Sequence, residues 1–192
     1  MDIEKLSNAL YEDLNGMITA VDNANGLVVR YECDDWAGED KRRRFNIFCR
    51  GVVEYEVRPS PSDFVHFLVS HPLLWNHNEP HGCLYYSSQP DSRHEVLGRI
   101  WEVHERIFKG WRPLAEFANV SYGGQPVEFC RGSHGQLAHG PLPLMEAYME
   151  AVDGLLVTNY VASHKPKGRL KVLVFDECFA VCDTVSVEEI NN

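Results

Sequence analysis

A period-two stretch from Arg44 to Arg58 constrains the fold of this chain more than any other feature. Its odd-numbered positions read Phe, Ile, Cys, Gly, Val, Tyr and Val, whereas its even-numbered positions are mostly charged or polar. Successive side chains of a strand point to opposite faces, so the pattern predicts a strand with one buried and one mostly wet face. Gly51 interrupts the stretch and indicates a bend or a bulge.

The neighbouring segments supply partners for this strand. Two strand-like runs, residues 17–22 and 27–33, flank an Asn-Ala-Asn-Gly turn, which predicts a hairpin. Further strands are expected at residues 82–88, 155–163, 169–175 and 178–187, with a hairpin through 164–168. Apolar residues at helical spacing predict helices at residues 2–14, 64–68, 91–109, 113–119 and 142–152. The stripe of the longest helix includes Trp101.

This order of elements lacks the regular alternation of strand and helix that builds parallel sheets. We therefore expect an α+β fold with a mostly antiparallel sheet and helices packed on one face. No internal repeat or linker-like composition interrupts the chain, and its 192 residues suit one domain over residues 1–192.

The net charge of −10 is concentrated at the two ends of the chain. Residues 1–40 carry −8 and residues 176–192 carry −5, whereas the middle carries +3. If the ends share one side of the fold, they form a negative face that repels nucleic acid and attracts a basic protein. The alternative is that these acids only keep the ends soluble. We expect no nucleic-acid partner, because the one dense basic run, Lys41–Arg44, follows four acidic residues that partly neutralise it.

The sequence also bears on where the protein works. It shows no apolar run near the roughly 20 residues needed to cross a bilayer, and its first residues lack a secretion signal. We therefore expect a cytoplasmic, bacterial protein without membrane contact, whose six scattered cysteines are reduced. No particular oligomeric state is predicted.

The segment HPLLWNHNEPHGC, residues 71–83, is the strongest local candidate for a metal site. His77 and His81 have a ligand spacing that works on a helix, and Cys83 supplies a third donor. Pro80 and Gly82 argue against a helix there, so a polar connection between a helix and a strand is the main expectation. Metal binding stays open as the alternative, and we expect no cofactor.

A glycine-rich segment, residues 123–140, is the candidate for a small-ligand site. Glycines before a helix can present backbone N–H groups to an anion, and four side chains could add contacts: Arg131, Ser133, His134 and His139. Neither of the two standard phosphate-binding glycine motifs is matched, and the nucleophilic-serine motif fails because Arg131 replaces its first glycine.

No complete catalytic motif is present, so we expect a protein that is not an enzyme. Trp36, Trp75 and Trp111 lie in or beside expected loops and are candidate anchors for a protein partner. Size, acidity and the missing motifs favour a cytoplasmic protein-binding module, such as an immunity-type protein that neutralises a basic bacterial toxin. The alternative is a small-ligand-binding protein or a hydrolase, metal-dependent or not, that uses residues 123–140.

Overall fold

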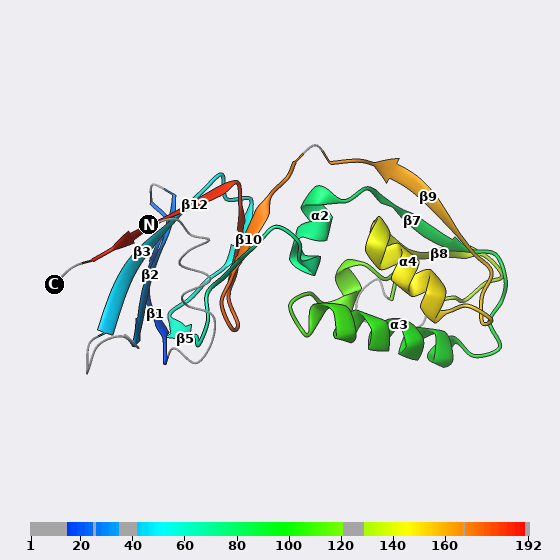
Figure 1. The fold of residues 1–192 in the computed structure, drawn as a ribbon. Coiled ribbons are helices and arrows are strands. Elements are labelled where there is room, and N and C mark those ends of the chain that lie inside the picture. Colours follow the sequence, from blue (N-terminus) through cyan, green and yellow to red (C-terminus); the bar gives the residue numbers. More distant parts are fainter. Residues whose placement is uncertain (1–14, 25, 35–41, 121–128, 167, 191–192) are drawn as a thin grey trace. The chain divides into compact units, whose positions relative to one another are not determined.

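Three antiparallel sheets and three α-helices form the part of the chain that the computed structural model describes, which confirms the expected α+β class. The described residues are 15–24, 26–34, 42–120, 129–166 and 168–190 (Figure 1). The helix expected at residues 2–14 lies outside them. The chain divides into two compact units, unit 1 with residues 1–74 and 169–192, and unit 2 with residues 75–168. A single domain over all 192 residues stays a prediction.

Unit 1 contains two antiparallel sheets. The five-stranded sheet has the order β12 (Thr184–Glu189), β3 (Arg42–Arg50), β2 (Leu27–Asp34), β1 (Met17–Asp22) and β5 (Ser60–Pro61). The four-stranded sheet has the order β4 (Glu54–Glu56), β11 (Phe179–Cys182), β10 (Lys171–Val174) and β6 (His66–Leu68). The hairpin of β1 and β2 is confirmed, with Asp22 opposite Val28.

Alternation of buried and exposed side chains places the core of unit 1. Every second residue of β2 is buried, and the central residues of β3 follow the same rule. These side chains join buried residues of β10 and β11 in one hydrophobic cluster that includes Ile47, Leu173 and Ala180. Within it, the Tyr31 hydroxyl donates a 2.8 Å hydrogen bond to the Ser62 carbonyl. A buried hydroxyl needs such a partner. This contact fixes the loop between β5 and β6, which contains Ser62, against strand β2 of the five-stranded sheet.

The stretch from Arg44 to Arg58 is not one strand but two, β3 and β4, which belong to different sheets. Gly51 separates them with a φ of +61°, a backbone conformation that glycine adopts without steric cost. The Asp183 carboxylate occupies the place where a side chain at position 51 would lie. The predicted bend at Gly51 is therefore confirmed, and it carries the chain from one sheet to the other.

The helix expected at residues 64–68 is wrong. Residues His66–Leu68 form strand β6, which pairs with β10 so that His66 lies opposite Val174. Phe64, Phe67 and Leu68 have helical spacing, but such a short apolar run fits either structure, and pairing with a neighbouring strand overrides it. A 3-10 turn, η1 (Pro72–Leu74), follows in place of a simple loop.

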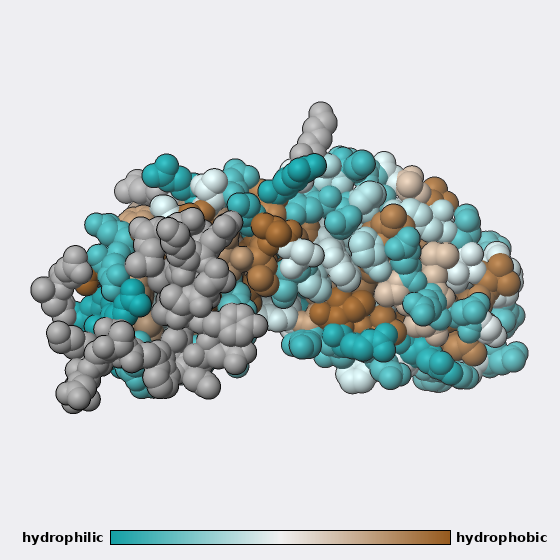
Figure 2. Space-filling model, in the orientation of Figure 1, coloured by the Kyte–Doolittle hydropathy of each residue, from teal (hydrophilic) through white to brown (hydrophobic). Residues whose placement is uncertain are grey.

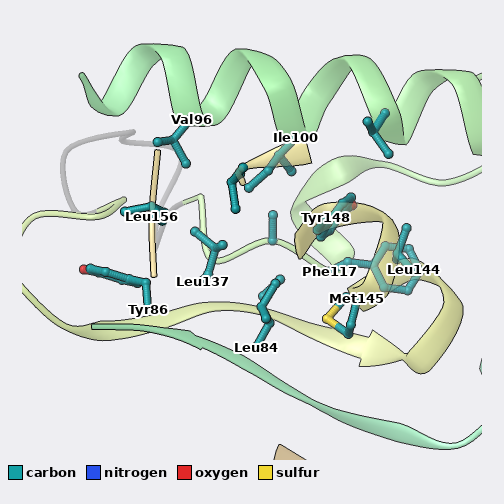
Figure 3. Close-up of a cluster of buried hydrophobic side chains, with 14 of the residues drawn as sticks. Leu84, Tyr86, Val96, Ile100, Phe117, Leu137, Leu144, Met145, Tyr148 and Leu156 are labelled. Carbon is teal, nitrogen blue, oxygen red and sulfur yellow. The ribbon is translucent and has the colours of Figure 1, made fainter. Parts of the chain in front are cut away.

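Unit 2 is a three-stranded sheet with helices on one face (Figures 1 and 3). Its strand order is β8 (Gly135–Pro141), β7 (His81–Tyr86) and β9 (Thr158–His164). The helical elements are α2 (Trp75–Asn78), α3 (Arg93–Phe108), η2 (Leu114–Glu116) and α4 (Leu142–Ala151). Figure 3 shows Val96 and Ile100 of α3 above Leu84 and Leu137 of the sheet, in the core that the helices cover. Among the described residues, no helix is long and apolar enough to cross a bilayer.

Helix α3 begins and ends at residues that satisfy its free backbone groups. The Ser92 hydroxyl accepts a 3.3 Å hydrogen bond from the Glu95 N–H, and Lys109 ends the helix in the left-handed conformation at a φ of 49°. The stripe predicted for this helix is correct at Val96 and Ile100 but wrong at Trp101, which is 55% exposed. Trp101 follows the buried Ile100 by one residue, about 100° around the helix, and so leaves the core face.

The hairpin expected through residues 164–168 is also wrong. Strand β9 pairs with β7 in unit 2, whereas β10 pairs with β6 and β11 in unit 1. The two strands therefore end up in different sheets although only six residues, 165–170, separate them. The nearest strand in the sequence is commonly the partner, but β9 pairs with β7, more than 70 residues earlier, and β10 pairs with the nearby β11 and the distant β6.

Candidate functional site

The surface formed by Val53, Glu54, Tyr55 and Glu56, here called the β4 patch, combines apolar and acidic side chains at an edge of the four-stranded sheet. Strand β4 pairs only with β11 among the described strands, with Tyr55 opposite Ala180. Val53 is 54% exposed and Tyr55 is 43% exposed. Exposed tyrosine next to carboxylates is an arrangement that suits recognition of a protein surface with positive charge.

Neighbouring polar groups hold the β4 patch in place. The Asn23 amide donates a 2.8 Å hydrogen bond to the Tyr55 hydroxyl, which keeps its own proton available for an acceptor. Arg58 lies between two carboxylates, 3.9 Å from Glu56 and 3.2 Å from Glu177. Both ion pairs are well exposed and contribute little stability. Glu56 of the patch and the neighbouring Glu177 therefore keep most of their attraction for an external cation.

The charge of the protein is divided unequally between the two units. Residues 1–74 and 169–192, which make up unit 1, carry 18 acidic and 10 basic residues, a net charge of −8. Unit 2 carries 10 acidic and 8 basic residues, a net charge of −2. Both acidic ends of the sequence belong to unit 1. That they share one side of the fold stays a prediction, because residues 1–14 lie outside the described part of the chain. By net charge, the unit that carries the β4 patch is therefore the more acidic of the two.

A second candidate is a polar cavity of about 410 Å³ at the start of α3. It is lined by residues 89–94, which include the helix N-cap Ser92, and by Cys130 and Arg131. Arg93, His94 and Arg131 bring positive or protonatable groups to the end of the helix that favours anions, and Asp91 opposes them. The cavity could accept a small anion.

Cys130 lies at the wall of this cavity but is a poor nucleophile. Its side chain is buried, and its backbone has a positive φ of 50°. Burial raises the pKa of the Cys130 thiol to about 11, although the charge of Arg93 acts in the opposite direction. Because the thiolate is the reactive form, the structure gives no support to covalent chemistry at this residue.

The four ligand-binding candidates of the glycine-rich segment are not brought together. Arg131 lines the cavity, whereas Ser133 and His134 are exposed neighbours whose Oγ and Nδ1 atoms lie 3.4 Å apart. His139 lies in β8, exposed and directly opposite Cys83 of β7. Residues 123–128 lie outside the described part of the chain. Of the predicted site, Arg131 alone lies at the cavity.

The three metal-ligand candidates occupy two elements that follow each other. His77 lies in α2, and Cys83 lies in the middle of β7. His81 begins β7, where its Nε2 atom is 3.0 Å from the Asn76 carbonyl oxygen. The segment is thus not only a connection, because it contains η1 and α2, and the element before it is strand β6 and not a helix. Helix α2 ends at Asn78, before Pro80 and Gly82. Within the described residues, no group of three or more His, Cys, Asp or Glu is placed to hold a metal ion.

Among the described tryptophans, Trp101 is more exposed than the two that were proposed as partner anchors, Trp75 and Trp111. Trp75 and Trp111 are partly buried against the core of unit 2, and the ring of Trp75 contacts Phe108 edge-on at 6.1 Å. Trp36 lies outside the described residues. Trp101, which the sequence pattern assigned to the core, is the exposed tryptophan of α3.

Comparison of the chain with protein-family models, with curated proteins and with solved structures gave no significant match.

Proposed function

We propose that the protein is a non-enzymatic protein-binding module that uses the β4 patch of unit 1 to bind a basic protein. The observation that carries this proposal is the alternation of exposed Val53 and Tyr55 with Glu54 and Glu56 along an edge strand, in the unit with a net charge of −8. Aromatic anchors at the centre of an interface supply most binding energy, while surrounding charge selects the partner and speeds association.

A basic bacterial toxin is the partner class that this chemistry fits best. A toxin that acts on nucleic acid carries a positive surface, and an acidic protein that covers that surface blocks it. The proposal thus gives the protein an immunity-type role in the cytoplasm.

The test is capture of partners from the native host with three forms of the purified protein. The first is the wild type, and the second carries Glu54→Lys and Glu56→Lys. The third carries Glu146→Lys and Glu150→Lys on α4, an identical change of net charge in unit 2. A basic partner bound one to one by the wild type and the third form, but lost with the second, supports the proposal. No stoichiometric basic partner, or equal loss with both variants, contradicts it.

The second candidate function is binding of a small anion, and the observation in its favour is the cavity beside Arg93 and Arg131. Inorganic phosphate serves as the probe. If the cavity binds anions, phosphate raises the melting temperature of the wild type and of an Arg99→Ala control but not that of Arg131→Ala. Arg99 lies on α3, where it pairs with Glu95 at 3.6 Å. An equal response in all three proteins rejects the site.

A further inference from the structure

The sheet of unit 2 has one closed edge and one open edge. At the outer edge of β8, residues 117–119 add backbone hydrogen bonds, from the Asn119 N–H to the Leu137 carbonyl at 2.9 Å and from the His139 N–H to the Phe117 carbonyl at 2.8 Å. At the other edge lies β9, and no described strand pairs with its outer side (Figure 1). An open strand presents a row of donors and acceptors to any extended chain.

The hydrogen bonds of Val157 show which groups of β9 face outward. Its carbonyl accepts a 2.9 Å bond from the Ser87 N–H, and its N–H donates a 2.8 Å bond to the Ser88 hydroxyl, so both groups point toward β7. Backbone groups of successive strand residues point to opposite edges. The N–H and C=O groups of Thr158, Tyr160 and Ala162 therefore point to the open edge.

This edge lacks the devices that usually prevent pairing. The strand TNYVASH contains no proline, lysine or carboxylate, and Lys165 and Pro166 come only after its end. A shift of register beside His81 disturbs β9 at Ser163, which leaves residues 158–162 as the regular part. Val161 on its outer face is 48% exposed. The visible face of unit 2 is otherwise mixed, with hydrophilic residues around small apolar areas (Figure 2).

We propose that β9 pairs with β9 of a second copy of this chain, antiparallel across a two-fold axis. Centred on Tyr160, this pairing places Thr158 opposite Ala162 of the other copy, so every outward-facing N–H and C=O of the regular part gains one partner. No like charges meet along residues 158–162, because none of these side chains is charged. The two sheets would join into one sheet of six strands.

The size of the contact sets the expected strength. The five residues of the regular part, 158–162, span roughly 17 Å. Edge-to-edge pairing over that length covers much less than the roughly 1,600 Å² typical of stable complexes. We therefore expect reversible dimers with a dissociation constant in the micromolar range, about 1 to 100 μM.

A charge-swap experiment tests the partner and the surface together. One variant carries Asn159→Lys and Val161→Lys, and another carries Asn159→Glu and Val161→Glu. Both positions are exposed on the outer face of β9, so the folded unit tolerates either pair. Self-pairing brings four like charges together in each variant, whereas a mixture brings opposite charges together. As a matched control, Thr184→Lys and Ser186→Lys add two lysines, and the same change of net charge as the lysine variant, to exposed positions of the edge strand β12 of unit 1.

Sedimentation measured from about 1 μM to about 1 mM protein gives the readout. Self-pairing predicts dimers of the wild type and the control, monomers of each β9 variant alone, and heterodimers in the equimolar mixture. A wild type that stays monomeric throughout, or β9 variants that dimerise like the wild type, overturns the proposal. Monomeric variants that fail to associate when mixed overturn it as well, since a second copy is then not the occupant of this edge.

Discussion

The Nδ1 atom of His104 lies 2.8 Å from the hydroxyl of Tyr148, and this contact joins α3 to α4 inside the core of unit 2. The Nε2 atom of the same ring lies 2.7 Å from the Arg112 carbonyl oxygen. A carbonyl can only accept, so Nε2 carries the proton and Nδ1 accepts from the tyrosine hydroxyl. His104 is fully buried, and its two nitrogens are thus both satisfied.

Replacing His104 by leucine should destabilise unit 2 strongly. The change keeps the apolar volume but leaves the Tyr148 hydroxyl and the Arg112 carbonyl without these partners, at an expected loss of about 2–4 kcal/mol in the free energy of unfolding. Tyr148→Phe, which removes one hydrogen bond, should cost about 1–2 kcal/mol. Urea unfolding followed by tryptophan fluorescence reports mainly on unit 2, because three of the four tryptophans belong to it, and Trp36→Phe in all forms removes the signal of unit 1. A loss below about 0.5 kcal/mol for His104→Leu would show that the contact is not stabilising.

Two glycines of unit 2 should respond in opposite ways to alanine. At Gly82 the added methyl group would meet the ring of Tyr160 and the Val161 carbonyl, so Gly82→Ala should destabilise the sheet by about 1–3 kcal/mol. Gly98 lies on the exposed side of α3 with nothing within 4 Å of the added methyl group. Gly98→Ala should therefore stabilise the protein by up to about 1 kcal/mol. Thermal melting of both variants checks the pair, and shifts of the same sign would contradict this account.

The fold class was predictable from the sequence because local patterns determine it. The period of two in β2 and β3 and the period near 3.6 in α3 and α4 directly reflect which face is buried. The partners of the later strands were not predictable in the same way. Strand β9 pairs with β7 and not with β10, and the helical spacing of Phe64, Phe67 and Leu68 conceals a strand. Both errors arise because pairing over long sequence separations outweighs local preference.

Cys83 should be the one cysteine of the native protein that reacts quickly with a thiol reagent. Five of the six free cysteines are buried, whereas Cys83 is partly exposed in β7. Brief treatment with N-ethylmaleimide near neutral pH should modify one thiol, which peptide mass spectrometry should locate at Cys83. Cys83→Ser should abolish this fast reaction. Equal modification of Cys130, whose pKa is raised to about 11 by burial, would contradict the structure.

Unit 1 should become less stable in acid, because protonation of Glu189 breaks its ion pair with Arg43. Arg43 donates hydrogen bonds of 2.8 and 3.1 Å to the two oxygens of Glu189, and this contact lowers the pKa of the Glu189 carboxyl. A pKa that is lower in the folded protein gives stabilisation that is present above the ordinary value of 4.5 and lost as the pH falls through the folded value.

Glu189→Gln is the variant that checks this pH dependence. Its free energy of unfolding should lie below that of the wild type at about pH 6, and the difference should shrink toward about pH 3. Chemical denaturation at a series of pH values measures both. A difference that stays constant across the series would show that the ion pair does not control the effect.

The candidate site was harder to predict than the fold. Net charge gave the acidic character of unit 1, but the β4 patch depends on the bend at Gly51, which turns Val53 and Tyr55 outward at a sheet edge. Read as one continuous strand, residues 44–58 placed Val53 and Tyr55 on the buried face. Arg131 was identified because a charged residue in a glycine-rich loop is conspicuous, whereas residues 89–94 meet it only through the tertiary fold.

The central claim, that the β4 patch binds a basic protein, is tested most directly by the affinity for the captured partner at two salt concentrations. Calorimetric titration at about 50 mM and about 500 mM NaCl should show at least tenfold weaker binding at the higher salt, since screening removes the attraction between exposed charges. Tyr55→Ala should weaken binding at both concentrations by about tenfold or more, because it removes the apolar anchor. Affinity that is independent of salt and unchanged by Tyr55→Ala would contradict the claim.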